Sequence, residues 1–198
     1  MKKIIKSINK KIESIDHEIY RIKKYIYLKN TRLTYIKDII KINHAGEISA
    51  QFLYYGQSFF IKQKFIKFFL LKSGKEEKKH LFWCLFYLNK YDSKKSSLYH
   101  VWKYGSFFIG NFPSIFNYKY NLGFLVETEF QVLQHLKHQI QGLSKSDYSL
   151  FFILKKMLRD EVKHANNAIL LKHEEIPYFT KYMMLIFSFF MVNTAPYI

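Results

Sequence analysis

The sequence predicts an all-α protein built on a four-helix bundle, and three observations support this fold class. Seven Gly and three Pro among 198 residues are too few for a turn-rich β protein. Apolar residues recur three and four apart over several long segments, which is the period of an amphipathic helix. Four of these segments carry inward-facing acidic residues, two of them as Glu-x-x-His pairs. A chain of this length can form one domain with a sizeable core.

Residues 1–35 are predicted to form an amphipathic helical extension in front of the bundle domain, residues 36–198. Isoleucines recur three and four residues apart from Ile5 to Ile26, flanked by lysines. A polar stretch at residues 30–32 interrupts this pattern. Three readings stay open for the extension: a helix added to the bundle, a coiled-coil contact between two copies, and a helix on a membrane surface.

The first two bundle helices are predicted around Glu47 and Glu77. The stripe that carries Glu47 runs from residue 36 to residue 57 and is partly polar. Glu77 and His80 share a face with Cys84 and the leucines beside it. Cys84 is the only cysteine, which excludes an internal disulfide, and it suits a small core residue better than a nucleophile.

A long apolar crossover follows, from residue 101 to residue 118, with one charge, Lys103. It either caps the bundle core or marks a contact with a membrane, ligand or partner. An apolar patch surrounded by lysines is typical of an enzyme docked on a membrane surface. The large side chains that we expect to make membrane or quinone contacts are Trp102, Phe107, Phe108, Phe112 and Phe116.

The last two bundle helices are predicted around Glu129 and Glu161. Glu129 lies at the centre of an apolar stripe, whereas Glu127 points away from it. Glu161 and His164 lie in the middle of another apolar stripe, where a solvated salt-bridge pair would not be expected. Each of the four helices therefore directs a carboxylate inward.

Four inward carboxylates and two histidines form the ligand set of a carboxylate-bridged di-iron centre in a helical bundle. Burying carboxylates is costly unless cations, protons or hydrogen bonds compensate, and two Fe(II) ions would balance four of them in charge. A single such Glu is more often paired with Lys, but four together favour a metal site. The chain intervals between the glutamates, 30, 52 and 32 residues, suit two antiparallel hairpins joined by a long crossover, which is the ferritin-like connectivity.

The net charge of +17 predicts attraction to anionic surfaces, although an A/T-rich genome would also enrich lysine. The start of the chain has no uninterrupted apolar core of a signal peptide, and the apolar run at residues 183–192 is short against the roughly 20 residues of a spanning helix. We therefore expect a protein that lies on a membrane without crossing it.

Four local motifs, INHAGE, EEKKHLFWC, VETEFQVLQHL and RDEVKHANNA, resemble the bacterial demethoxyubiquinone hydroxylase family of ubiquinone biosynthesis. The resemblance covers residues 36–198. It implies a ferritin-like fold, two iron ions, and O2-dependent hydroxylation of a polyprenyl benzoquinol at a membrane surface. It also implies the metal ligands: Glu47, Glu77 and His80 for one iron, Glu129, Glu161 and His164 for the other, with Glu77 and Glu161 bridging.

Two further residues are candidates for supporting roles. Asp160 is a candidate to hold the Nδ1 proton of His80, or else an exposed acid. His135 is a candidate hydrogen-bond donor or electron-route residue near the metals, or else a solvated histidine. Leu136 stands where some relatives have Tyr, so no tyrosine role is carried over.

The expected partners are a polyprenyl quinol, O2, a membrane surface, an electron donor, and a second copy or a partner protein. No nucleic acid is expected, because no Gly-rich phosphate loop is present and the crossover is apolar. The expected location is the cytoplasmic face of the bacterial inner membrane, or alternatively the matrix face of the mitochondrial inner membrane. Two other classes stay open: another ferritin-like di-iron enzyme, such as a ferroxidase or a tRNA hydroxylase, and a metal-free helical membrane adaptor.

Overall fold

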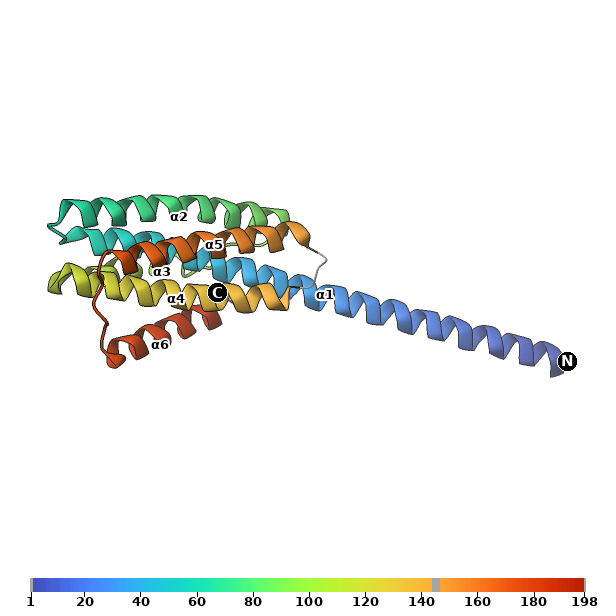
Figure 1. Cartoon of the computed structure of the whole chain (residues 1–198). Coiled ribbons are helices and arrows are strands. Elements are labelled where there is room, and N and C mark those ends of the chain that lie inside the picture. The colour runs from blue at the N-terminus through green and yellow to red at the C-terminus, as the bar shows by residue number, and fades with distance from the viewer. Residues whose placement is uncertain (1, 144–146, 198) are drawn as a thin grey trace. The chain divides into compact units, whose positions relative to one another are not determined.

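A computed structural model describes residues 2–143 and 147–197, and for residues 2–30 it describes only the backbone. The described part of the chain is helical, with no strand (Figure 1). Its elements are α1 (Lys2–Phe59), α2 (Lys64–Lys90), α3 (Tyr99–Phe116), α4 (Tyr118–Gly142), α5 (Tyr148–Leu170) and α6 (Tyr178–Thr194). The all-α prediction is confirmed.

The bundle is made by the second half of α1 together with α2, α4 and α5 (Figure 1). Helices α1 and α2 follow each other through a short connection, as do α4 and α5, and the crossover between the two pairs contains α3. This order is the ferritin-like connectivity that the chain intervals predict. The crossover is therefore helical, and α3 continues through Gly105, Gly110 and Pro113.

The chain divides into two compact units, Met1–Ile36 and Lys37–Ile198. Helix α1 extends from Lys2 to Phe59, so the polar stretch at residues 30–32, which interrupts the isoleucine pattern, does not interrupt the helix. Three polar residues do not remove a backbone hydrogen bond as Pro would, which is the physical reason that they are tolerated. The isoleucine stripe from Ile5 to Ile26 lies outside the residues whose side chains are described, and the role of the extension stays a prediction.

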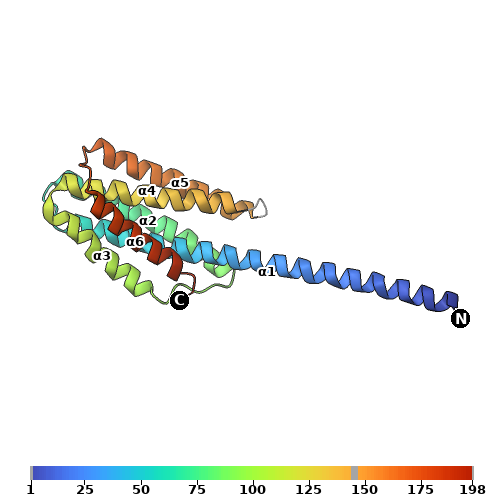
Figure 2. The same ribbon diagram turned by 90° about the horizontal axis from the view of Figure 1, so that it is seen from below.

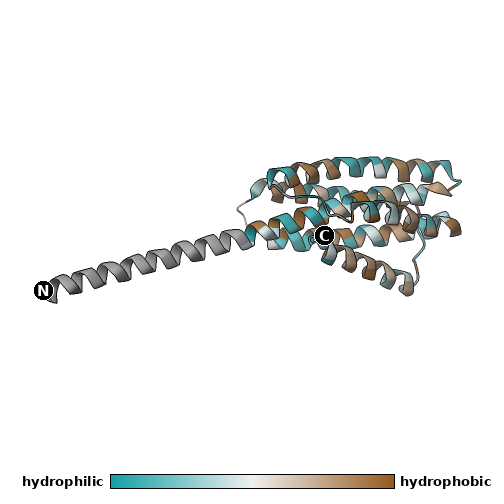
Figure 3. Cartoon of the chain, turned by 180° about the vertical axis from the view of Figure 1, so that it is seen from behind, coloured by the Kyte–Doolittle hydropathy of each residue, from teal (hydrophilic) through white to brown (hydrophobic). Residues whose placement is uncertain are grey.

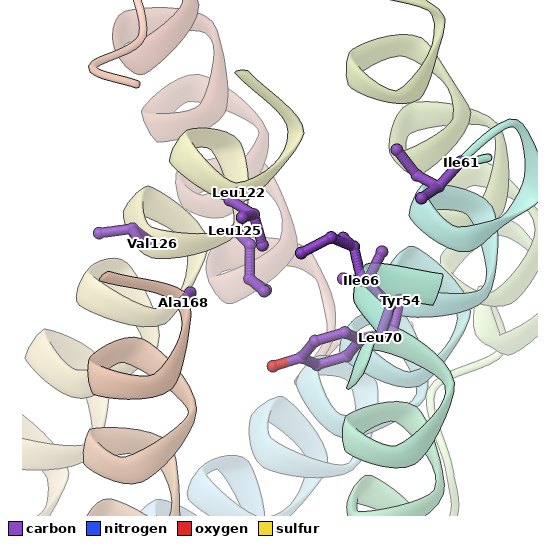
Figure 4. Close-up of a cluster of buried hydrophobic side chains, with 8 residues drawn as sticks. All are labelled: Tyr54, Ile61, Ile66, Leu70, Leu122, Leu125, Val126 and Ala168. Atoms are coloured by element: carbon purple, nitrogen blue, oxygen red, sulfur yellow. The ribbon is translucent and has the colours of Figure 1, made fainter. Parts of the chain in front are cut away.

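One apolar cluster occupies an end of the bundle, close to the connection between α1 and α2 (Figure 4). It brings together side chains from α1, α2, α4 and α5: Tyr54, Ile66, Leu70, Leu122, Leu125, Val126 and Ala168, with Ile61 from the connection. Most of these positions belong to the apolar stripes read from the sequence. These apolar contacts hold the four helices together beside the segments that carry the inward glutamates.

Helix α3 packs closely against α1 because each helix has a glycine at the contact. A Cβ atom on Gly56 would collide with the carbonyl oxygen of Phe107, and one on Gly110 would collide with the carbonyl oxygen of Leu53. Both residues therefore permit a backbone approach that no larger residue allows. Side chains also join α3 to α6, since the rings of Trp102 and Phe190 lie 6.0 Å apart.

Helices α3 and α6 lie side by side and expose a large set of apolar side chains (Figure 2). We call these residues the apolar face: Val101, Tyr104, Phe108, Phe112, Ile115 and Phe116 of α3, and Phe179, Tyr182, Leu185, Ile186, Phe187, Phe189 and Phe190 of α6. The hydropathy colouring shows the apolar character of α6 (Figure 3). Within the described residues, no helix has the length and hydropathy needed to span a membrane.

The five predicted contact residues of the crossover divide into two groups. Phe108, Phe112 and Phe116 are exposed, and Phe107 is half-buried. Trp102 is buried, and its indole N–H donates to Ser96 Oγ at 3.2 Å. The structure therefore corrects the expectation for Trp102, because this side chain packs with Ala45, Ile48 and Ala195 in a buried apolar cluster.

Candidate metal centre

Four glutamates and two histidines meet in the middle of the bundle. Helix α1 supplies Glu47, α2 supplies Glu77 and His80, α4 supplies Glu129, and α5 supplies Glu161 and His164. None of the six side chains is more than 5% exposed. We call this group the carboxylate cluster. The i, i+3 spacing in α2 and α5 places each glutamate and its histidine on one helix face, and the apolar stripes turn that face inward.

The inward nitrogen of His80 lies among three carboxylates. Its Nδ1 atom is 3.3 Å from Glu47 Oε2, 3.1 Å from Glu77 Oε2 and 3.0 Å from Glu161 Oε1. One N–H group donates a good hydrogen bond to one of these oxygens at a time. Accordingly, Glu47 Oε2 has no hydrogen-bond partner although it lies within ion-pair distance of the ring.

Glu77 and Glu161 each reach both histidines. Glu77 Oε2 lies 3.1 Å from His80 Nδ1, while its Oε1 lies 3.1 Å from His164 Nδ1. Glu161 does the same with Oε1 at 3.0 Å from His80 Nδ1 and Oε2 at 3.1 Å from His164 Nδ1. These two carboxylates thus span the distance between two inward nitrogens. This is the placement that bridging carboxylates require.

The outward nitrogens of the two histidines face a second pair of acids. His80 Nε2 lies 3.4 Å from Asp160 Oδ2, and His164 Nε2 lies 3.0 Å from Glu76 Oε2. Each acid directly precedes a glutamate of the cluster in sequence, and each contacts the histidine of the opposite helix. An acid at this position holds the Nε2 proton, so that Nδ1 is the nitrogen that would bind a metal ion after losing its own proton.

Asp160 therefore contacts His80, but at Nε2 and not at the expected Nδ1. The physical reason is that Nδ1 faces Glu77 one turn earlier on the same helix, at 3.1 Å. The role of Glu76 was not predicted. A signal for it was present, because Glu76-Glu77-x-x-His80 and Asp160-Glu161-x-x-His164 have the same pattern of two acids followed by a histidine.

Burial and mutual interactions shift the proton affinities of the cluster strongly. Burial raises the pKa values of Glu47 and Glu129 well above the usual value, against the opposing attraction of His80 and His164 respectively. Burial also acts to raise the pKa of Glu161, but hydrogen bonds and charge from the two histidines outweigh it and lower this pKa to about 2. Without metal, protons therefore supply part of the charge compensation that these acids need.

The two histidines shift in the opposite sense. Burial acts to lower their pKa values, but the neighbouring carboxylates more than offset this effect. The pKa of His164 rises to about 12, through hydrogen bonds and charge from Glu161 and Glu77. The pKa of His80 also rises strongly, beside Glu47, Glu161 and Glu77.

The donor set fits two metal ions. Two groups of residues share Glu161, and within each group the ligand atoms all lie within 4.8 Å of one another. The first group is Glu47, Glu77, His80 and Glu161, and the second is Glu129, Glu161 and His164. Imidazole and carboxylate together suit iron and similar transition metals. Buried carboxylate oxygens of Glu47 and Glu77 also lack hydrogen-bond partners, and a cation would satisfy them where one imidazole proton does not.

A tyrosine also contacts the cluster. It belongs to α1, whereas the sequence comparison considered a tyrosine only at position 136, on α4. Tyr54 of α1 is fully buried, and its hydroxyl donates to Glu129 Oε1 at 2.6 Å. Burial and the nearby carboxylates raise the pKa of Tyr54 well above its usual value. Its position in the inward stripe of α1 was visible in the sequence, but its partner on α4 was not.

The two glutamates of α4 point in different directions, as the helical periodicity predicts. Glu129 is buried in the cluster, whereas Glu127 is half-buried and accepts a hydrogen bond from Gln131. His135 is half-buried, and its Nε2 lies 3.0 Å from Ser188 Oγ on α6. His135 is therefore not a fully solvated histidine.

Two openings of different character reach the cluster. The apolar cleft, beside α1, α4 and α6, is lined by Ile42, Asn43, Gly46, Glu47, Ala50, Glu129, Val132, His135, Leu136, Glu161, Met191 and Val192. The polar pocket, between α2 and α5, is lined by Phe69, Lys72, Ser73, Glu76, Lys79, His80, Asp160, Lys163, His164 and Asn167. The glutamates are reached from the first opening and the outward histidine nitrogens from the second.

Comparison with known proteins gives a consistent family assignment. The family model described as "Ubiquinone biosynthesis protein COQ7" matches residues 34–195. A protein of Legionella pneumophila (strain Corby) is 37% identical over 164 residues, which cover 83% of this chain and 77% of the relative. A Nitrosospira multiformis protein is 37% identical over 157 residues, covering 79% and 76%, and an Acinetobacter baylyi protein is 35% identical over 164 residues, covering 83% and 78%. All three relatives are named 3-demethoxyubiquinol 3-hydroxylase.

The resemblance read from the four motifs is therefore confirmed, and this chain belongs to the COQ7 family of ubiquinone biosynthesis proteins.

Proposed function

We propose that this chain hydroxylates the ring of a demethoxyubiquinol with O2 at a di-iron centre, while docked on a membrane surface. The observation that carries the proposal is the carboxylate cluster, in which two inward histidine nitrogens and four buried glutamates form two overlapping ligand groups. The names of the relatives supply the substrate class and the reaction.

The six residues of the cluster would hold the metals. Glu47, Glu77 and His80 would bind one iron, Glu129, Glu161 and His164 the other, and Glu77 and Glu161 would bridge them. When bound, the two iron ions would supply the O2 chemistry that places one oxygen atom on the ring and releases the other as water, with two electrons from an external electron donor and two protons from solvent. Asp160 and Glu76 orient the two imidazoles by holding their Nε2 protons.

The apolar cleft would admit the quinol ring by widening, since its volume in this structure is about 40 Å³. The aliphatic part of its lining suits an apolar ring and excludes water from the reacting atoms. Met191 and Val192 of α6 form one wall, and other residues of α6 belong to the exposed apolar face. A quinol carried in a bilayer would therefore reach the cleft from the side on which the protein docks.

The apolar face and the excess of lysines would act together in this docking. Large exposed aromatic residues insert between lipids, and the +17 net charge attracts anionic headgroups. We infer a peripheral location on the cytoplasmic face of the bacterial inner membrane, where the quinol is available.

Quinone profiling tests the reaction directly. The gene is expressed in a bacterial strain that lacks its own hydroxylase, and quinones are measured by mass spectrometry. The wild-type chain and Glu127→Ala are expected to restore ubiquinone and deplete the demethoxy precursor, while Glu161→Ala is expected to do neither. An unchanged profile from an expressed, iron-loaded protein would reject the proposal, and rapid Fe(II) oxidation by that protein would then favour a ferroxidase.

A further inference from the structure

The apolar cleft contains one polar group that no contact within the protein explains. Asn43 lines the cleft and is 8% exposed, and its Nδ2 atom has no hydrogen-bond partner among the described residues. A buried amide N–H without a partner is unfavourable and uncommon. The other neutral polar side chain of the cleft differs, because His135 contacts Ser188.

The position of Asn43 places this unused donor next to the carboxylate cluster. Asn43 precedes Glu47 by four residues on α1, so the two side chains lie one above the other on the same helix face. Both line the cleft, together with Glu129 and Glu161. A ring that enters the cleft thus meets the amide of Asn43 beside the residues that would hold the metals.

We propose that Asn43 positions the substrate by donating a hydrogen bond from Nδ2 to the methoxy oxygen of the quinol ring. The inference rests on the proposed function, because it takes the cleft as the substrate site. A methoxy oxygen accepts a hydrogen bond but cannot donate one, so it suits an N–H donor. An amide suits this place because it stays neutral, so it adds no charge next to four carboxylates.

This hydrogen bond gives the cleft a means of orienting the ring, since the three glutamates of its lining would hold the metals and His135 contacts Ser188. Apolar walls hold a flat ring without fixing its rotation in the plane. A single buried donor discriminates strongly between rings that carry an acceptor and rings that do not, since the unsatisfied donor opposes binding of the latter. Asn43 would therefore determine which ring carbon faces the reacting oxygen.

The test uses the iron-loaded protein under anaerobic conditions, where binding is measured without turnover. The probes are a short-tailed methoxy-methyl-benzoquinone and an analogue in which methyl replaces methoxy. Asn43→Leu keeps the branching and the number of side-chain heavy atoms but removes the donor, and Asn43→Ala removes the donor without adding volume. We expect Asn43→Leu to bind the methoxy compound about tenfold or more weakly than wild type, with a small change for the analogue and unchanged iron content.

A matched variant controls for a general effect of replacing asparagine. Asn167 lines the polar pocket and is exposed, so Asn167→Leu is expected to leave quinone binding unchanged. With O2 and reductant present, Asn43→Leu is expected to raise KM more than it lowers kcat, and the preference for the methoxy ring is expected to disappear. A residue with a merely structural role would not change that preference.

Three outcomes would overturn the proposal. In the first, Asn43→Leu binds the methoxy compound as wild type does. In the second, both compounds lose affinity equally, which would indicate lost packing. In the third, Asn43→Leu and the smaller Asn43→Ala both fail to fold, which would make Asn43 a core residue. Failure of the proposed function is distinguishable, because the wild-type protein itself would then neither bind nor hydroxylate the quinone.

Discussion

The apolar cleft and the polar pocket reach the same carboxylate cluster from different sides and with opposite chemistry. The cleft presents aliphatic side chains, three glutamates of the cluster, His135 and the amide of Asn43, whereas the pocket presents three lysines and the two acids that contact the histidines. The difference suits a division of two tasks. In the proposed function, substrate access belongs to the side of α1, α4 and α6, and orientation of the histidines belongs to the side of α2 and α5.

The largest expected effect comes from removing a ligand of the carboxylate cluster itself, which both openings reach. Glu129→Ala is expected to abolish loading of at least one iron ion, because it removes a buried carboxylate of the cluster. Glu127→Ala, two residues away on another face of α4, is expected to retain most of the iron. Iron per protein is measured after anaerobic loading and desalting. Equal losses in the two variants would refute the assignment of Glu129 as the inward ligand.

The polar pocket is tested next, through the two acids outside the cluster. Glu76→Ala and Asp160→Ala are each expected to weaken Fe(II) affinity by about ten- to a hundredfold, because His164 or His80 then loses the group that orients its ring. Anaerobic titration gives the affinity, and the exposed Glu175→Ala is the control. Anaerobic binding of the short-tailed quinone should stay close to wild type. If quinone binding falls as much as iron binding, the two sides are not functionally separate.

The pH dependence of iron binding tests the charge balance of the cluster. The pKa values of His80 and His164 are raised strongly, that of His164 to about 12, so both imidazoles of the metal-free protein retain their protons near neutral pH, and burial raises the pKa values of Glu47 and Glu129 as well. Metal binding must release those protons, and affinity therefore rises with pH. Between pH 6 and pH 7 we expect Fe(II) affinity to increase at least about tenfold, with proton release detected by an indicator dye. An affinity that is constant or falls over this interval would contradict the assignment.

The smallest effect is expected outside both openings, on the apolar face. Replacing Phe108 and Phe112 with Ser is expected to weaken binding to anionic vesicles by about tenfold or more at high salt, because each buried phenylalanine contributes roughly 1.5 to 3 kcal/mol. High salt screens the contribution of the lysines. Phe65 and Phe68 on α2 are equally exposed, so their double Ser variant is a matched control. Vesicle sedimentation measures the binding.

The activities of these variants refine the result. Hydroxylation of a short-tailed, water-soluble quinol is expected to survive in the Phe108 and Phe112 variant better than hydroxylation of the long-tailed substrate, since only delivery is impaired. Normal vesicle binding by this variant, or equal loss of both activities, would show that the exposed phenylalanines of α3 do not dock the protein.

The sequence by itself determined the helical class, the order of the bundle helices and the inward placement of the six cluster residues. These properties depend on periodicity along one helix, which is local. Glu161 and His164 had to share a face because they are three residues apart, and that face had to be buried because leucines and a methionine precede it and alanines follow it. The separation of Glu129 from Glu127 follows from the same geometry.

Only the tertiary structure decided the properties that depend on distances between helices. It placed Nε2 of His80 against Asp160, paired Glu76 with His164 across two helices, and joined Tyr54 to Glu129. It also turned Trp102 into the core, exposed one side of α6, and left the amide of Asn43 without a partner. A helical pattern specifies which way a side chain points, but its partner depends on how near and at what height the next helix packs.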